Sequence, residues 1–228
     1  MWVRVHFVVE GQTEEQFVNT VLRKYFEDRS VQVTARVITT GRDRHRHHLT
    51  HKGGLNKFGH AYREIHRCIM EDKTALCTTM FDLYQIPEDF PDYQQSSKII
   101  DPYERVNTLE KWLAEKIDNR RFIPYIQLYE FETLLFSDIQ KLQMQHPDFI
   151  DQINKLAETT STFKSPELIN DGKLTAPSKR IIQSVPEYPF YKQSSGPVTA
   201  ERIGMPVLLS KCRHFREWIE RLCNAQMD

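Results

Sequence analysis

The fold of this chain is decided near its start by Val3-Arg4-Val5-His6-Phe7-Val8-Val9-Glu10-Gly11-Gln12-Thr13-Glu14-Glu15-Gln16-Phe17. The apolar, β-branched run before Glu10 is typical of a buried strand, and Gly11 bounds it. Thr13, followed by apolar residues from Phe17 onward, predicts the start of a helix. We therefore expect Glu10 at the carboxyl end of a strand, which is where ligands bind in open α/β sheets.

Later stretches repeat this alternation of strand and helix. The patterns predict strands at 31–38, 74–81 and 121–128, and helices from Thr13 to about 27–30, from 55 to 71 and from 102 to 117. Strands that are joined through helices run parallel, with right-handed crossovers. The sequence therefore predicts an α/β fold with a doubly wound parallel sheet and flanking helices.

The alternation of strand and helix patterns ends after residue 137. Short helical pieces and proline-bearing connectors follow as far as 195, and an amphipathic helix over 207–223 is expected to pack on the sheet. A chain of 228 residues suits one α/β domain with a smaller appendage. We therefore expect an α/β core at 1–137 and a C-terminal helical extension at 138–228 that packs on the core.

The charges of the chain balance, with 31 Lys and Arg against 31 Asp and Glu. No global field draws such a chain to nucleic acid or to an acidic membrane, so nucleic-acid binding would need a local basic patch. The four cysteines form no CxxC motif, no apolar run approaches the ~20 residues of a membrane span, and no signal segment is visible. We therefore expect a soluble, cytoplasmic protein with reduced thiols.

Acidic residues follow three of the predicted strands: Glu10 with Glu14, then Asp82, then Glu130 with Glu132. The carboxyl ends of parallel strands meet at one edge of a sheet. Carboxylates gathered there repel each other unless they bind a hard cation, and Mg²⁺ (or Mn²⁺) typically takes one or two carboxylates while it keeps waters for a phosphate substrate. The pattern predicts metal-assisted phosphoryl chemistry, although Glu14 alone is also explained as a complement to the helix dipole.

Four motifs give the chain a resemblance to a known family. They are Val9-Glu10-Gly11-Gln12-Thr13-Glu14, Phe81-Asp82-Leu83-Tyr84-Gln85-Ile86-Pro87, Gln127-Leu128-Tyr129-Glu130-Phe131-Glu132-Thr133-Leu134-Leu135-Phe136-Ser137-Asp138 and Pro177-Ser178-Lys179-Arg180-Ile181. With them the chain resembles the TOPRIM fold of topoisomerases, primases and OLD-type nucleases. It looks most like a bacterial TOPRIM-like family of unknown function (DUF4276-like), whose members often neighbour AAA-type ATPases in phage-defence loci. The resemblance runs from Val9 to about Trp218 and implies a TOPRIM/Rossmann-like core.

The resemblance implies roles for the first acids. Glu10 matches the TOPRIM glutamate, a metal ligand or general acid/base, and Glu14 matches the second acid of the OLD-type pair. Asp82 matches the first aspartate of the Asp-x-Asp motif. A nuclease of this kind would bind one or two Mg²⁺ between these three residues, which lowers the pKa of a bound water and holds the scissile phosphate.

The second aspartate of that motif is missing, because Tyr84 stands at its position. Either Glu130 or Glu132 substitutes for it as a metal ligand, or Asp89 folds in from the loop, or catalysis has been lost. Glu130 is nearer the strand end and is the first choice. If the chain stays extended, Glu130 and Glu132 lie on the same side, whereas in a helix they diverge.

A cation must stabilise the leaving charge of such a reaction. Lys179 is the first candidate for this catalytic role and Lys192 the second, and Arg180 and Lys192 are candidates for binding nucleic acid. The alternative for each is a solvated surface charge, the commoner fate of a Lys or Arg.

The segment 42–54 is basic, rich in histidine and ends in two glycines. As a nucleic-acid contact, it would use side chains and backbone N–H groups of Arg42, Arg44, Arg46, Lys52, Gly53 and Gly54. A mobile surface loop is one alternative and a zinc site is another. The histidines (His45, His47, His48 and His51) have no Cys partner and no HExxH frame, which argues against zinc.

These observations favour a metal-dependent phosphodiesterase, an endonuclease of TOPRIM type, and the resemblance implies a phage-defence effector regulated by a partner AAA-type ATPase. The alternative is a catalytically degenerate TOPRIM-like binding or regulatory subunit. A flavodoxin-like domain that binds a nucleotide or small molecule is the third hypothesis. No Walker A loop or GxGxxG is present, and neither a Ser/His/Asp triad nor a nucleophilic cysteine has a local signature.

Overall fold

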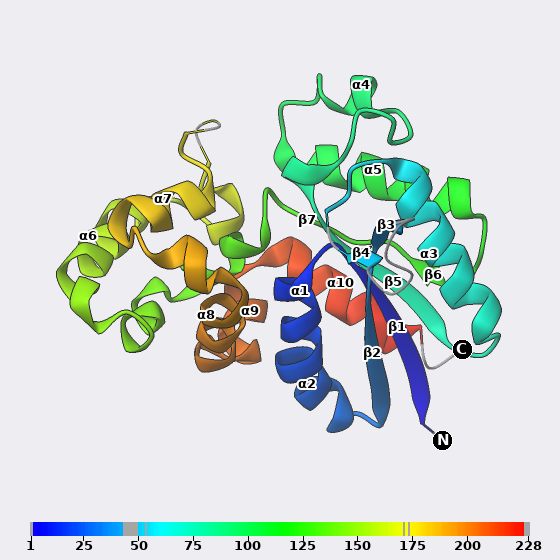
Figure 1. Ribbon diagram of the computed structural model, residues 1–228, viewed down its shortest axis with the longest axis horizontal. Helices are drawn as coiled ribbons and strands as arrows, with labels where there is room; N and C mark the ends of the chain where they lie inside the picture. Colours follow the sequence, from blue (N-terminus) through cyan, green and yellow to red (C-terminus); the bar gives the residue numbers. More distant parts are fainter. Residues whose placement is uncertain (1, 43–49, 53, 171, 173, 226–228) are drawn as a thin grey trace. The chain divides into compact units, whose positions relative to one another are not determined.

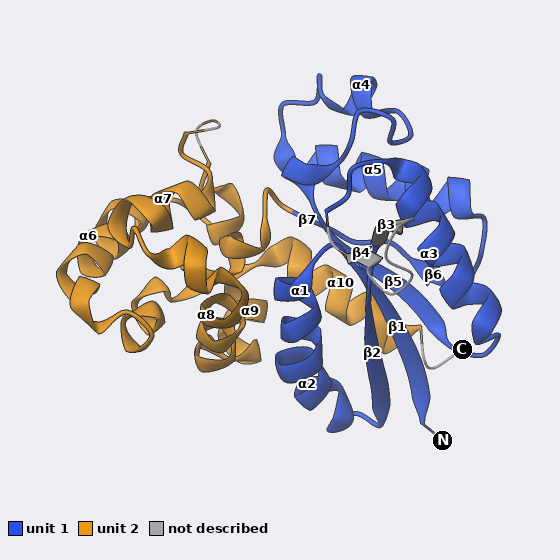
Figure 2. Ribbon diagram, viewed as in Figure 1, with its two compact units in different colours: residues 1–127 blue, residues 128–228 orange. Residues whose placement is uncertain are grey.

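A computed structural model describes residues 2–42, 50–52, 54–170, 172 and 174–225 of the protein. The chain forms two compact units, residues 1–127 and residues 128–228 (Figure 2). The sequence predicted a boundary after residue 137, whereas the units divide after residue 127. The segment 128–137 therefore belongs to the second unit.

Unit 1 contains the expected parallel sheet. Its strands are β1 (Val3–Val9), β2 (Val31–Val37), β5 (Leu76–Asp82), β6 (Phe122–Ile123) and β7 (Ile126–Gln127). The order is β2-β1-β5-β6, with β7 also paired to β5, and every pair is parallel. Val9 is aligned with Val37 on one neighbouring strand and with Met80 on the other. The predicted α/β class with a doubly wound parallel sheet is therefore confirmed.

Helices cover both faces of this sheet (Figure 1). The first crossover, from β1 to β2, is a continuous helical segment made of α1 (Gln12–Phe17), the π-helix η1 (Val18–Leu22) and α2 (Arg23–Glu27). The later crossovers use α3 (Phe58–Glu71) and α5 (Pro102–Ile117). These crossovers lead from β2 to β5 and from β5 to β6, in the opposite direction along the sheet to the crossover from β1 to β2, so right-handed connections place them on the opposite face. The short η2 (Leu83–Gln85) and α4 (Tyr93–Ser96) lie between β5 and α5.

The last strand of the sheet is broken, whereas the sequence predicted one strand over 121–128. Pro124 has no N–H to donate to a ladder, so pairing stops there. The hydroxyl of Thr79 replaces the missing ladder bonds, because it donates to the Tyr125 carbonyl and accepts from the Tyr125 N–H, both at 2.9 Å. Beyond the break, the Ile126 N–H donates to the buried carboxylate of Glu110 at 2.8 Å.

A two-stranded hairpin interrupts the connection between β2 and α3, where the sequence predicted a loop. Strand β3 (Thr39–Arg42) pairs antiparallel with β4 (Thr50–Lys52). The segment 43–49 between them and Gly53 lie outside the described residues.

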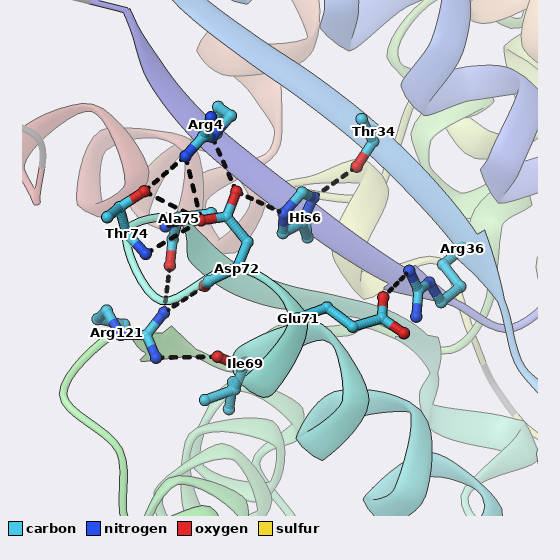
Figure 3. A network of polar contacts seen from close by, with 10 residues as sticks. All are labelled: Arg4, His6, Thr34, Arg36, Ile69, Glu71, Asp72, Thr74, Ala75 and Arg121. Atoms are coloured by element: carbon cyan, nitrogen blue, oxygen red, sulfur yellow. Dashed lines mark hydrogen bonds and ion pairs between the residues drawn. The ribbon is translucent and has the colours of Figure 1, made fainter.

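The amino-terminal end of the sheet is held by a network of polar contacts (Figure 3). The guanidinium of Arg121 donates to the carbonyls of Ile69 (3.0 Å), Asp72 (2.7 Å) and Ala75 (2.9 Å). A cation here satisfies and complements the carbonyl end of α3. Arg4 on β1 reaches the carboxylate of Asp72 at 2.8 Å, so strand and helix are joined at this end.

Unit 2 is built from helices only, among its described residues. They are η3 (Phe131–Ser137), η4 (Ile139–Met144), η5 (Pro147–Phe149), α6 (Ile150–Thr160), η6 (Pro166–Leu168), α7 (Pro177–Ser184), α8 (Tyr188–Ile203), α9 (Met205–Lys211) and α10 (Arg213–Asn224). The helix predicted over 207–223 is thus split at Cys212. The buried carboxylate of Glu167 accepts the N–H groups of His214 and Phe215, both at 3.0 Å, so the start of α10 is capped from η6.

No helix in the described part of the chain combines the length and the apolar character that a membrane span requires.

Candidate functional site

Two of the predicted acids lie together at the carboxyl edge of the sheet in unit 1. Glu10 directly follows β1 and Asp82 is the last residue of β5, the neighbouring parallel strand. The two residues are only 9% and 6% exposed. The Asp82 N–H donates to Oε2 of Glu10 at 3.3 Å. The strand register therefore brings the Glu10 carboxylate to the backbone of Asp82.

Glu14 lies in the first turn of α1 and is 5% exposed. A Cβ atom built on Gly11 would lie 3.1 Å from Oε2 of Glu14, so a side chain at position 11 would push against this carboxylate. The absence of a side chain at Gly11 leaves room for the Glu14 carboxylate beside the corner between β1 and α1. Glu10, Glu14 and Asp82 are thus three buried acids in one unit.

These acids fit a cation with few protein ligands better than a closed metal cage. No group of three or more His, Cys, Asp or Glu side chains within the described residues is arranged to hold a metal ion. Mg²⁺ differs from zinc and calcium in that it commonly uses one or two carboxylates and keeps several waters. The Glu10 and Asp82 carboxylates, with Glu14 close to the strand–helix corner, match that smaller ligand demand in chemistry and number.

Tyr84 stands at the position of the missing aspartate, and Asp89 is one of the residues that the sequence suggested as its replacement. Tyr84 lies in η2 and is 38% exposed. Asp89 accepts the N–H of Phe58 at 2.9 Å. This bond caps the first turn of α3 from a distant loop, and it explains why α3 begins at Phe58 rather than at the predicted residue 55. Asp89 therefore has a structural role as a helix cap.

The C-terminal end of the basic segment 42–54 is hydrogen-bonded to Glu10. The Gly54 N–H donates to the Glu10 carbonyl at 3.1 Å, and Gly54 has a φ of +79°, which favours glycine. This N–H is already bonded within the protein, so it differs from the free phosphate-binding amide that the sequence suggested. Arg42 and Lys52 are the last residues of β3 and β4. Arg44, Arg46 and Gly53 lie outside the described residues.

Glu130 and Glu132 lie in unit 2, near the start of η3. Tyr129 before them has a φ of +60°, an uncommon conformation for a residue with a side chain, and Glu130 is extended. Glu130 accepts two hydrogen bonds from Ser178, from its N–H at 2.5 Å and from its hydroxyl at 2.9 Å. Glu130 therefore holds the first turn of α7.

Glu132 is fully buried and bonds to α8. Its Oε1 lies 3.0 Å from Nζ of Lys192 and accepts from the Tyr188 hydroxyl at 3.1 Å, while its Oε2 has no hydrogen-bond partner among the described residues. Burial raises the pKa of Glu130, and the nearby charge of Glu132 raises it further, while Ser178 and Lys192 act in the opposite direction. Two acids and one lysine thus form an electrostatically coupled cluster in unit 2.

The predicted cations have different surroundings. Lys192 is paired with Glu132, whereas Lys179, the first candidate, is exposed on α7. Arg180 donates from Nε to the Thr175 carbonyl at 2.8 Å, and its guanidinium lies 5.5 Å from the ring centroid of Phe163. Lys192, not Lys179, is therefore the lysine that the structure brings to a predicted acid.

Comparison with known proteins identifies the family of the chain. A family model described as "Domain of unknown function (DUF4276)" matches residues 9–223. The chain belongs to this family. Among solved structures, the C-terminal region of the OLD protein of Xanthomonas campestris pv. campestris is similar to it, with 15% sequence identity, 99% of this chain and 96% of that chain covered, and a TM-score of 0.46. Among curated proteins, no match is found.

In this DUF4276 protein, sequence reasoning missed two partners of the acids, Ser178 and Tyr188. Both are 8% exposed or less and belong to helices of unit 2. The Pro177-Ser178 pair at the start of α7 was a usable signal, because a helix N-terminus offers N–H groups to a carboxylate. No local signal marked Tyr188, which meets Glu132 only through the folding of α8 against η3.

Proposed function

We propose that this DUF4276 protein is a metal-dependent phosphodiesterase, an endonuclease of TOPRIM type. The observation that carries the proposal is the meeting of Glu10 and Asp82, two buried acids at the carboxyl ends of adjacent parallel strands. Burying carboxylates is costly unless they are paired, hydrogen-bonded or bound to a cation, so two such acids at a strand edge favour a ligand-binding role.

In this proposal Glu10 and Asp82 would hold Mg²⁺ or Mn²⁺, with Glu14 at the strand–helix corner as a further acid. When bound, such an ion supplies positive charge for the scissile phosphate and lowers the pKa of the attacking water. The basic segment with Arg42, Arg44, Arg46 and Lys52 supplies contacts to the nucleic-acid backbone. The C-terminal end of this segment is held beside Glu10 by the hydrogen bond from the Gly54 N–H to the Glu10 carbonyl.

The other residues that the sequence suggested for this chemistry lie in unit 2. They are Glu130 and Glu132 as candidates for the acid that Tyr84 replaces, Lys179 and Lys192 for the leaving charge, and Arg180 for contact with nucleic acid. The contact between Lys192 and Glu132 supports Lys192 as the more constrained of the two lysines.

A second candidate function is a binding or regulatory subunit that has lost turnover. The observation that favours it is Tyr84, which is partly exposed where the resemblance calls for a metal-binding aspartate. By its resemblance to relatives in phage-defence loci, either form of the protein would act in the cytoplasm as a defence component, regulated by an AAA-type ATPase partner.

A cleavage assay distinguishes the two functions. Purified protein is incubated with labelled single-stranded DNA, double-stranded DNA or total tRNA, with Mg²⁺, Mn²⁺ or EDTA. We expect metal-dependent cutting by the wild type and at least a hundredfold loss in Asp82→Asn. Glu15→Gln, which changes a neighbouring acid in the same helical turn, is the matched control and should cut normally. Binding without cutting, with or without an ATPase partner, would support the regulatory subunit.

Metal binding is tested separately from cleavage by thermal unfolding. A ligand that binds only the folded state raises the melting temperature, by an amount that grows with the logarithm of one plus the ratio of ligand concentration to Kd. Millimolar Mn²⁺ or Mg²⁺ should therefore raise the melting temperature of the wild type and of Glu15→Gln but not of Glu10→Gln, an isosteric change. An equal metal response in all three proteins would contradict the assignment of Glu10 as a ligand.

A further inference from the structure

Unit 2 contains a chain of three hydrogen-bonded side chains that the proposed nuclease does not use. Nδ1 of His146 lies 2.6 Å from Oε1 of Glu187, and Nε2 of His146 lies 2.9 Å from the hydroxyl oxygen of Ser195. His146 comes just before η5, Glu187 just before α8, and Ser195 lies within α8. His146 and Ser195 are each 2% exposed, and the side chain of Glu187 is 42% exposed.

The two hydrogen-bond partners of His146, Glu187 and Ser195, determine which ring nitrogen carries the proton. An ionised carboxylate can only accept hydrogen bonds, so Nδ1 of His146 is protonated and donates the hydrogen bond to Glu187. In the neutral imidazole Nε2 is then an acceptor, and the Ser195 hydroxyl donates to it. This arrangement is the one in which a histidine removes the proton of an attacking serine while an acid fixes the histidine tautomer.

A cavity of about 250 Å³ borders this chain of side chains. It is lined by all three members and by Gln145, Pro147, Asp148, Tyr191 and Ser194. The Tyr191 ring lies 6.1 Å from the His146 ring, between centroids. Ser195 and His146 therefore line a space of the size of a small molecule.

The charges of the cavity indicate the class of ligand. Two acidic residues, Asp148 and Glu187, line it, and among the described residues neither a Lys nor an Arg does. Like charges would repel a phosphodiester or another anion, and they would not hinder an uncharged or cationic molecule. The small volume further restricts the group that can approach Ser195.

We infer that Ser195, His146 and Glu187 form a second catalytic site, which cleaves small uncharged or cationic esters by acyl transfer. Ser195 Oγ forms a bond to the ester carbonyl carbon and gives its proton to Nε2 of His146. The bond from that carbon to the leaving oxygen breaks, and the alcohol departs with the proton from His146. Water then attacks the acyl-serine, with His146 again moving the proton, and the acid is released with Ser195 regenerated. Glu187 is a positioning residue.

This site shares no residue with the metal-dependent site. Lys192, one turn before Ser195 on α8, contacts Glu132. A failure of either assignment therefore leaves the other unaffected.

The test is covalent labelling with an uncharged short-chain alkyl fluorophosphonate, followed by intact-mass and peptide mass spectrometry. The serine oxygen forms a bond to phosphorus and fluoride leaves, so the reagent reports an activated serine directly. We expect one adduct per chain, mapped to Ser195. Ser195→Ala should abolish it and His146→Gln should slow it at least a hundredfold. Ser210→Ala removes an exposed serine hydroxyl outside this cavity and should label like the wild type.

The role of Glu187 has its own readout. Glu187→Gln should lower the maximal labelling rate about tenfold or more, without changing the reagent concentration that gives half of that rate, and Glu187→Asp should recover part of the loss. Wild-type protein with a native circular dichroism spectrum that gains no adduct at Ser195 would overturn the inference. So would labelling of folded His146→Gln at the wild-type rate. Because the adduct is mapped on the wild type, the result does not depend on the folding of any variant.

Discussion

At the scale of single residues, Asp72 illustrates how one carboxylate can join separate elements. It accepts from the backbone and hydroxyl of Thr74 and pairs with Arg4 on β1, and His6 lies 3.4 Å away (Figure 3). Burial raises its pKa, but the bonds from Thr74, the charge of Arg4 and the bond from His6 outweigh this and lower the pKa to about 2. The ionised form of Asp72 is therefore the one that the folded protein stabilises.

Asp72→Asn should lower the free energy of unfolding by about 1–3 kcal/mol at pH 7, since hydrogen bonds to a charged group are lost. The pKa of Asp72 is lower in the folded state than its ordinary value of 3.8. Its contribution is thus complete above about pH 4 and is lost as the pH falls toward 2. Urea unfolding at several pH values measures this.

The control is Asp28→Asn, because Asp28 is exposed at the end of α2. Its effect should stay within about 0.5 kcal/mol at every pH. If Asp72→Asn and wild type differed as much at pH 2 as at pH 7, the stabilisation would not come from the charge of Asp72.

At the scale of elements, the join between β5 and the broken strand β6–β7 depends on a side chain. The fully buried hydroxyl of Thr79 makes two hydrogen bonds with the backbone of Tyr125, where Pro124 interrupts the ladder. Asp82 is the last residue of the same strand. These hydrogen bonds therefore help to hold β5, the strand that ends in the candidate acid Asp82.

Thr79→Val keeps the shape of the side chain but removes both hydrogen bonds between its hydroxyl and the Tyr125 backbone. We expect a loss of about 2–4 kcal/mol in the free energy of unfolding, because two buried polar groups lose their partner. Thr79→Ser retains the hydroxyl and should lose clearly less. Chemical denaturation compares the three proteins, and equal stability of the valine and serine variants would mean that the hydroxyl does not replace the ladder.

At the scale of the whole molecule, the balance of 31 basic and 31 acidic residues leaves no net attraction for nucleic acid. Binding would then depend on the basic segment, and its salt dependence reports how many phosphates that segment contacts. Changing Arg42, Arg44 and Arg46 together to Gln should reduce the slope of log K against log salt by about 2–3.

The matched control for this prediction has the same change in charge at three exposed arginines elsewhere, Arg63, Arg120 and Arg202. It should keep the wild-type slope in fluorescence anisotropy with a labelled oligonucleotide. If both triple variants changed the slope equally, net charge rather than the basic segment would govern binding.

The sequence by itself determined the parallel sheet, its helical crossovers and the placement of Glu10 and Asp82 at strand ends. Local periodicity carries this information, because the spacing of apolar residues reports which face of a strand or helix is buried. The sequence also contains a signal for the break in the last strand, Pro124, which the prediction of one strand over 121–128 did not use.

Only the tertiary structure decided the partners of the functional side chains. Glu130 meets Ser178, Glu132 meets Lys192, and Asp89 caps a helix that begins 31 residues before it. His146 lies 41 residues from Glu187 and 49 from Ser195 along the chain, so no local motif announces their hydrogen bonds. Such contacts form when whole elements pack, because the free energy of burying their apolar faces, and not any local propensity, brings the polar groups together.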